Sequence, residues 1–256
     1  MARRLTRGLG FVLARRIKGV VNHACVKLDL RESIQASMFL GIYEPTQTRW
    51  FKMCLAPGDT VIDVGASFGY YTTLASKLVG PKGHVFAIEP SHVANQVIED
   101  AVNDTGIDNV TLIKAAVGKE AGYVNLYLPT TKYLHSPSVL PSDPDFIAHQ
   151  VPVVVLDQYD PLWATQRIKL VKIDVEGYEP NVLDSMEGLI RNRRIENVVC
   201  EFNSGWLKRN STVPEQLLQR FLDYGFRIRA QTELQEKLVG HHGELFDLQD
   251  IWFSID

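Results

Sequence analysis

Short apolar runs alternate with helical patterns along most of the chain. Runs rich in branched aliphatic residues predict five buried strands, over residues 60–64, 84–88, 110–113, 168–174 and 197–202. Between these runs, apolar residues recur every three or four positions, which predicts helices around residues 74–78, 93–102 and 182–186. This alternation is typical of an α/β fold, so we expect an open, mostly parallel sheet with helices on both faces.

The pattern changes toward the C-terminus. A fourth helix is predicted from Thr212 to Gly225, because Thr212 and Glu215 have the spacing of a capping box and Pro214 suits a first helical turn. The segments FRIRA (226–230) and IWFSI (251–255) follow it. We expect them to form an antiparallel C-terminal strand pair that closes the sheet.

One stretch interrupts the repeating pattern. The segment YVNLYL (123–128) alternates like a half-buried strand, and residues 129–150 then carry four prolines and show no helical period. A stretch of this length without a pattern predicts an inserted loop. The chain has 256 residues, which fits one large domain. We therefore expect a basic segment over residues 1–27 and one domain over residues 28–256.

Positive charge is concentrated at the N-terminus. The net charge is -3, yet seven of the 27 lysines and arginines lie in the first 28 positions, before any acidic residue. Apolar residues between them predict an amphipathic helix in residues 1–27, and residues 1–20 have the composition for peripheral contact with anionic lipid. A solvated helix that packs on the domain is the favoured alternative, because one basic segment binds membranes weakly.

The composition favours a cytoplasmic protein. The short apolar stretch GLGFVLA is followed at once by Arg15 and Arg16, which argues against a signal peptide. No run of about 18 apolar residues predicts a membrane span. The three cysteines have no CxxC spacing, so the sequence predicts neither a disulfide framework nor a zinc site.

Candidate chemistry begins in the stretch TVIDVGASFGYYTT (60–73). A strand that ends with Asp63 is followed by Gly65 and Gly69, which let the backbone pass close to a ligand and open a helix. Glu89 ends the next strand, where a carboxylate accepts hydrogen bonds from both hydroxyls of a ribose. Because ligands bind at the carboxyl ends of parallel strands, the sequence predicts a site for an adenosine-bearing cofactor.

The glycine spacing separates two classes of cofactor. A dinucleotide site needs G-x-G-x-x-G, whereas this chain has Asp63 two residues before Gly65 and no glycine at position 67. A carboxylate repels a pyrophosphate and attracts the ammonium group of a methionyl moiety. The balance favours S-adenosylmethionine.

Three segments resemble the FkbM-type S-adenosylmethionine-dependent methyltransferases. They are VIDVGASFGYYT, FAIEPS (86–91) and, most specifically, LVKIDVEGYEPNVL (170–183). The similarity extends over about residues 28–203 and includes DLRESIQASMFLGIYEP, AVGKEAGYVNLYL and the VVLDQYD segment (154–160). The chain departs from the family pattern in LIKAAVG and in EFNSG, and the second departure leaves the general base open.

This resemblance implies a Rossmann-like, class I methyltransferase domain. It implies O-methylation of a hydroxyl on a sugar, glycan or secondary metabolite. The expected cofactor-binding residues combine the glycine turn, the strand ends and the upstream IYEP segment: Asp63, Gly65, Ala66, Ser67, Gly69, Tyr70, Glu89, Ala116, Asp174 and Glu44.

The expected catalytic residues are Asp174, Glu201 and His135. Methyl transfer needs a hydroxyl held in line with the methyl group and a base for its proton, and carboxylates at converging strand ends meet both needs. Asp174 is the first candidate, whereas His135 lies in the proline-rich stretch and is a weaker one. Oxygen ligands from Asp174, Glu201 and Asn203 would suit Mg²⁺. A metal-free site is favoured because scattered oxygen-bearing residues are common at sheet edges.

Two other functions stay open at this point. An NAD(P)-dependent oxidoreductase is the runner-up, although the glycine spacing and the lack of a Tyr-x-x-x-Lys pair argue against it. A non-catalytic interaction protein that retains the fold is the other alternative. Nucleic acid is not an expected partner, because basic residues cluster in the N-terminal segment alone.

Overall fold

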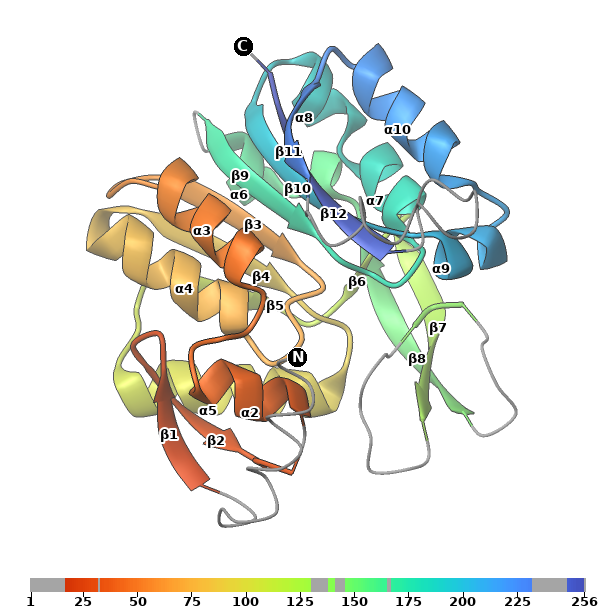
Figure 1. Cartoon of the computed structure of the whole chain (residues 1–256). Coiled ribbons are helices and arrows are strands. Elements are labelled where there is room, and N and C mark those ends of the chain that lie inside the picture. Colours follow the sequence, from red (N-terminus) through yellow and green to blue (C-terminus); the bar gives the residue numbers. More distant parts are fainter. Residues whose placement is uncertain are drawn as a thin grey trace, which may run out of the picture.

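A twisted, mostly parallel sheet lies at the centre of the protein (Figure 1). The computed structural model describes residues 17–31, 33–129, 138–140, 146–164, 167–231 and 248–255. Within these residues, seven strands have the order β11-β12-β10-β9-β3-β4-β5. Their bounds are β3 Thr60–Val64, β4 His84–Ile88, β5 Val110–Ile113, β9 Ile168–Ile173, β10 Ile195–Asn203, β11 Arg227–Gln231 and β12 Leu248–Ser254. Strands β10, β9, β3, β4 and β5 run parallel to one another, and β12 is antiparallel to both of its neighbours, β10 and β11.

Helices cover both faces of the sheet, as the alternation of the sequence predicts (Figure 1). One face carries α3 Pro45–Cys54, α4 Tyr70–Val79 and α5 His92–Thr105. The other face carries α6 Asp160–Ala164, α7 Glu179–Ser185, α8 Glu187–Arg191 and α10 Pro214–Asp223. Successive strand residues point to opposite faces, so each strand contributes to both hydrophobic layers. In β3, for example, Val61 packs under α4 and Ile62 packs under α7 and α8.

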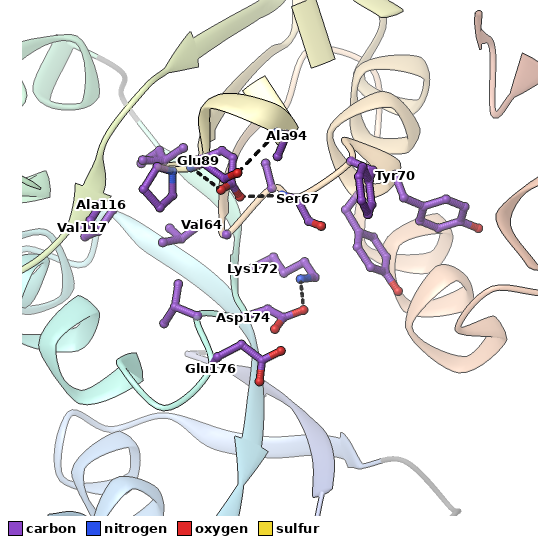
Figure 2. A pocket seen from close by; sticks show the side chains of 18 of the residues that line it. Val64, Ser67, Tyr70, Glu89, Ala94, Ala116, Val117, Lys172, Asp174 and Glu176 are labelled. Atoms are coloured by element: carbon purple, nitrogen blue, oxygen red, sulfur yellow. Dashed lines mark hydrogen bonds and ion pairs between the residues drawn. The ribbon is translucent and has the colours of Figure 1, made fainter. Parts of the chain in front are cut away.

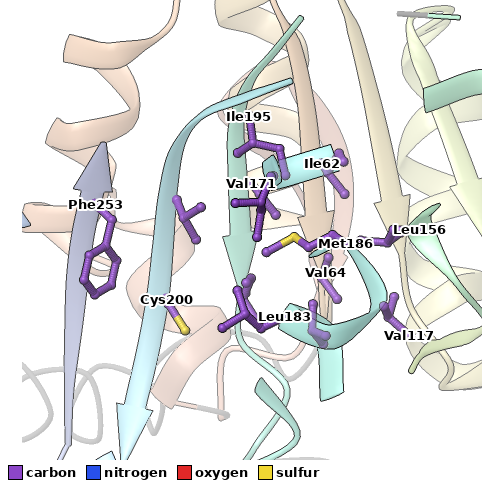
Figure 3. Close-up of a cluster of buried hydrophobic side chains, with 14 of the residues drawn as sticks. Ile62, Val64, Val117, Leu156, Val171, Leu183, Met186, Ile195, Cys200 and Phe253 are labelled. Atoms are coloured by element: carbon purple, nitrogen blue, oxygen red, sulfur yellow. The ribbon is translucent and has the colours of Figure 1, made fainter. Parts of the chain in front are cut away.

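The larger hydrophobic core lies on the α7 and α10 side of the sheet (Figure 3). Figure 3 shows Val171 of β9, Cys200 of β10 and Phe253 of β12 among its members. The rings of Phe221 and Phe253 stack with centroids 4.2 Å apart, which joins α10 to β12. The closing antiparallel pair of β11 and β12 expected from the sequence is confirmed.

The segment before the sheet differs from its prediction. Residues Ile17–Val21 (β1) and Ala24–Leu28 (β2) form an antiparallel hairpin rather than a helix, and α2 (Ser33–Phe39) follows. Alternate residues of β2 are buried against the domain, which is the period of a strand and not of a helix. Lys18 and Lys27 of this hairpin pair with acids of α5. Residues 1–16 lie outside the described part of the chain, so the expectation of lipid contact is not addressed there.

The predicted inserted loop is in part a strand. In the described residues, β7 (Gly122–Pro129) pairs with β8 (Phe146–Val154), and β8 also pairs with β6 (Ala116–Val117) in a separate small sheet. Residues 146–150 therefore belong to β8, although the sequence analysis assigned these residues to the loop. The error arose because most of these residues are exposed, so they show no apolar alternation. The candidate base His135 lies outside the described residues.

Helix α10 starts two residues later than predicted. Its N-cap is Val213, whose backbone N–H donates to Oε1 of Gln216 at 3.2 Å. The hydroxyl of Thr212 instead donates to the carbonyl of Asn210 at 3.3 Å, so the expected capping box of Thr212 and Glu215 is wrong. In the described part of the chain, no helix is long and apolar enough to cross a membrane.

Candidate functional site

A pocket lies where the strand order reverses. The chain passes from β3 outward to β4 and β5, and then returns to the other side of β3 as β9 and β10. Ligands bind at such a switch point, outside the carboxyl ends of the strands. The wall of the pocket includes the turn after β3, the ends of β4 and β9, and residues of α2, α4 and α5 (Figure 2).

The turn after β3 brings two segments of backbone together. Gly65 has a φ of 80°, and a Cβ atom at this position would lie 1.9 Å from the carbonyl oxygen of Asp174. Only glycine permits this approach of the β3 turn to the end of β9. Gly69 follows as the N-cap of α4, also with a positive φ of 78°.

Two of the six non-glycine residues with a positive φ among the described residues lie on the wall of the pocket. Ser67 and Glu176, with φ values of 50° and 52°, both line it, and Glu44, with a φ of 38°, lies at the start of α3. Left-handed conformations of residues other than glycine cost about 1–3 kcal/mol and cluster at functional sites. Independent of any motif, this strain supports the assignment of a site here.

Glu89 holds the glycine turn and faces the pocket. Its Oε2 accepts a hydrogen bond from the backbone N–H of Ser67, and its Oε1 accepts one from that of Ser91, both at 2.8 Å (Figure 2). Burial raises the pKa of Glu89 to about 7, although the two N–H groups oppose this shift. Since each carboxylate oxygen accepts more than one hydrogen bond, Glu89 retains capacity for hydroxyl donors of a ligand.

Asp174 follows β9 and forms an ion pair on the wall of the pocket. Its Oδ2 lies 2.8 Å from Nζ of Lys172, and its side chain is 30% exposed (Figure 2). The turn that follows is held by Glu179, whose Oε1 accepts hydrogen bonds from the backbone N–H groups of Val175 and Gly177. These hydrogen bonds fix the backbone of the turn, and both Asp174 and Glu176 of this turn line the pocket.

Further acids lie close to the ion pair on the α3 and α4 face of the sheet. Asp63 accepts a hydrogen bond from Thr72, and Glu44 accepts one from Tyr71 at 2.6 Å. Burial raises the pKa of Asp63 and of Glu44 above their ordinary values, although Lys172 opposes both shifts. Carboxyl groups therefore gather around Lys172 behind the wall of the pocket.

The remaining acids belong to the strands beyond β9. Glu201 of β10 is the register partner of Asp250 of β12. Burial raises the pKa of Asp250 to about 7 and that of Glu201 well above its usual range, and Asp174 adds to both shifts. Burial therefore favours the protonated form of both groups.

The structure brings most of the predicted cofactor residues together. Those that line the pocket are Gly65, Ala66, Ser67, Tyr70, Glu89, Ala116 and Asp174. Others are not on its wall: Asp63, Gly69, Glu44 and Glu201. Contact of this second group with a cofactor or acceptor stays a prediction, and the carboxylate of Glu44 is engaged by Tyr71 instead.

The pocket has the features that an adenosine-bearing methyl donor needs. The close turn at Gly65 suits the methionyl end of such a molecule and the carboxylate of Glu89 suits its ribose, and residues 63–228 match the family described as Methyltransferase FkbM domain. The chain belongs to the FkbM methyltransferase family. The expected resemblance is thus confirmed, and FkbM membership implies S-adenosylmethionine as the cofactor.

Other methyltransferases are similar to parts of this chain. Protein-L-isoaspartate O-methyltransferases of Fervidobacterium nodosum and Methanothermobacter thermautotrophicus are 32% and 27% identical to it over 120 and 78 residues. These matches span 60% and 36% of the two relatives and 42% and 29% of this chain.

A solved structure supports the predicted fold class. A protein of Clostridium thermocellum with a provisional rRNA-methylase assignment superimposes with a TM-score of 0.51 at 14% identity. The superposition covers 83% of this chain and 95% of that one. It confirms the Rossmann-like α/β fold of the FkbM domain.

The acids around the FkbM pocket do not form a metal centre. Among the described residues, no group of three or more His, Cys, Asp or Glu side chains has an arrangement that would hold a metal ion. Asp174 is paired with Lys172, and Glu201 faces Asp250 across two strands.

Two charged residues of the site escaped the sequence analysis. Lys172 stands in the run LVKID, and a charge inside an otherwise apolar strand was the signal that pointed to a buried partner. Asp250 accepts a hydrogen bond from Gln47 of α3. Its place depends on the register of β12 against β10, which no local pattern reveals.

The affinity for S-adenosylmethionine is expected to rise with pH. Ribose hydroxyls donate to the ionised form of Glu89, and the pKa of this carboxyl in the free protein is about 7. Binding below pH 7 requires loss of a proton, so the affinity should increase about tenfold from pH 6 to pH 8 and then level off. Calorimetric titration over this range tests the prediction. Glu89→Gln should bind more weakly and without this pH dependence, whereas a flat wild-type profile would contradict the assignment.

Proposed function

We propose that this protein is an S-adenosylmethionine-dependent O-methyltransferase that acts on a hydroxyl of a sugar, glycan or secondary metabolite. The observation that carries the proposal is the place of Asp174. Its carboxylate lies on the pocket wall, beside the Gly65 turn, and one of its oxygens is held by Lys172. A carboxylate fixed in this way suits the removal of a proton from an acceptor hydroxyl.

Different residues of the chain would bind the methyl donor and the acceptor in such a reaction. When bound, S-adenosylmethionine supplies an electrophilic methyl group, which bonds to the acceptor oxygen as the carbon–sulfur bond breaks and its electron pair stays on sulfur. Glu89 and the Gly65 turn hold the donor, and Asp174 orients the acceptor hydroxyl and takes its proton. The proton then passes to solvent, since Asp174 is partly exposed.

Two observations support oxygen as the acceptor atom. The Fervidobacterium and Methanothermobacter relatives are named as O-methyltransferases. A hydroxyl also needs a base during transfer more than a neutral thioether or amine does, and the carboxylate of Asp174 lines the pocket. The free state of Cys25, Cys54 and Cys200 supports a reducing compartment, and we place the protein in the cytoplasm.

The first experiment is a titration of the purified protein with S-adenosylmethionine, S-adenosylhomocysteine and NADH. Micromolar affinity for the first two ligands and none for NADH is expected. A screen of hydroxylated glycans and metabolites with methyl-labelled donor would then identify the acceptor, and label recovered as a methyl ether supports the proposal. Binding of NADH alone would favour an oxidoreductase, and binding of none of the three would favour a non-catalytic role.

A further inference from the structure

Lys172 is a buried ammonium group in the middle of an apolar strand. Lys172 is 3% exposed, and the apolar residues near it in β9 belong to the hydrophobic cores on the two faces of the sheet. A buried charge is strongly unfavourable unless it is paired and hydrogen-bonded. The fold therefore retains this lysine at a cost, on the wall of the functional pocket.

Negative groups surround Lys172 on the α3 and α4 face of the sheet. Nζ lies 2.8 Å from Oδ2 of Asp174 and 4.9 Å from the ring centroid of Tyr71, and Asp63 of β3 is its register partner. Glu44 at the start of α3 and Asp250 of β12 also interact with it electrostatically. Asp174 and Glu176 both interact electrostatically with Glu201 of β10.

Lys172 is charged in this setting. Burial alone would lower its pKa, but the carboxylates of Asp174, Asp63 and Glu44 outweigh burial and raise the pKa above its ordinary value. A protonated amine donates hydrogen bonds and cannot accept a proton from an acceptor hydroxyl. The role of Lys172 is therefore electrostatic and not that of a base.

We propose that Lys172 is a positioning residue of the methyl-transfer centre. It holds Asp174, which lines the pocket, by Oδ2, and so leaves Oδ1 to accept a hydrogen bond from an acceptor hydroxyl. Its charge also offsets the acids around the pocket, so that the cationic donor is not bound far more tightly than its neutral product. This inference rests on the proposed function.

The physical reason lies in the change of charge during the reaction. S-adenosylmethionine carries a positive sulfonium, whereas S-adenosylhomocysteine is a neutral thioether, and the charge on sulfur falls in the transition state. Acids that stabilise the sulfonium stabilise the ground state more than the transition state, which slows transfer. A fixed cation beside Asp174 limits this effect while the carboxylate remains in place.

The test compares the affinities of the two ligands by calorimetry at pH 8, and it needs no acceptor. Lys172→Met removes the charge and keeps the length of the side chain. It is expected to increase the preference for S-adenosylmethionine over S-adenosylhomocysteine about three- to tenfold. Lys172→Arg keeps the charge and is expected to restore the preference toward the wild-type value.

Lys169→Met is the matched control. Lys169 lies on the same strand, and its Nζ is also 2.8 Å from a carboxylate, that of Glu196, but it does not line the pocket. Its substitution should leave the preference unchanged. A wild-type preference in Lys172→Met, or a shift toward S-adenosylhomocysteine, would overturn the inference.

A second variant with the opposite expected effect tests the inference if Lys172→Met does not fold. Asp174→Asn removes a negative charge and should lower the preference for S-adenosylmethionine about three- to tenfold. An unchanged preference would overturn the inference. Failure of the wild-type protein to bind either ligand would overturn the proposed function itself, so the two failures are distinguishable.

Discussion

Asp174→Asn is expected to lower the rate of methyl transfer about 10²- to 10⁴-fold. The amide has the shape of the carboxylate but cannot take a proton from the acceptor, and it loses the ion pair with Lys172. Because Glu89 and the Gly65 turn are unchanged, the affinity for S-adenosylmethionine should change no more than about tenfold. Single-turnover transfer of labelled methyl to an identified acceptor measures the first quantity, and calorimetry measures the second.

Asp184→Asn provides the control for this substitution. Asp184 of α7 also pairs with a cation, Arg220 of α10, but it lies away from the pocket. Its substitution should leave the transfer rate within about twofold of the wild type, because the pair is partly exposed to solvent and does not touch the pocket. An Asp174→Asn enzyme with the wild-type rate would exclude Asp174 as the base and shift attention to Glu201 or His135.

Gly65→Ala is expected to abolish measurable cofactor binding and to destabilise the fold by about 3 kcal/mol. The added methyl group would lie 1.9 Å from the carbonyl oxygen and 2.9 Å from the carbonyl carbon of Asp174, both of them backbone atoms. The β3 turn and the end of β9 would have to separate, which displaces the groups that face the donor. Thermal unfolding and calorimetric titration measure the two effects.

Gly106→Ala is the control for Gly65→Ala, because it adds the strain of a left-handed backbone without a steric clash. Gly106 ends α5 with a φ of 69°, and a Cβ atom there has no neighbour within 4 Å. It should cost only about 1–2 kcal/mol of stability, from the left-handed conformation, and leave cofactor affinity intact. Equal losses in the two variants would mean that the contact with Asp174 contributes nothing specific.

The central sheet is predictable because its strands carry their own signal. The runs at β3, β4, β5 and β9 are apolar on both faces, and the boundaries from sequence agree with the structure to within one residue. The hairpin of residues 17–28 was missed because basic and apolar residues mix there with no clear period of two. The start of β8 was missed because its exposed residues lack alternation.

Site residues that lie close together in sequence are predictable, whereas contacts that depend on how the strands pair are not. The glycine turn and Glu89 are local features of the ends of β3 and β4, so sequence spacing identifies them. The meeting of Lys172 with Asp63 arises from the pairing of β9 with β3, and that of Glu201 with Asp250 from the pairing of β10 with β12. Such juxtapositions require the strand order, which no single segment encodes.

The position of β12 has a consequence for the order of assembly during synthesis. Asp250 of β12 accepts a hydrogen bond from Gln47 of α3, across 203 positions of sequence, and β12 fills the gap between β10 and β11. A nascent chain that has emerged only as far as β11 leaves the edge of β10 without its partner strand, with Glu201 on that edge. An open strand edge recruits other strands, so this interval of translation is when the protein most needs protection from aggregation.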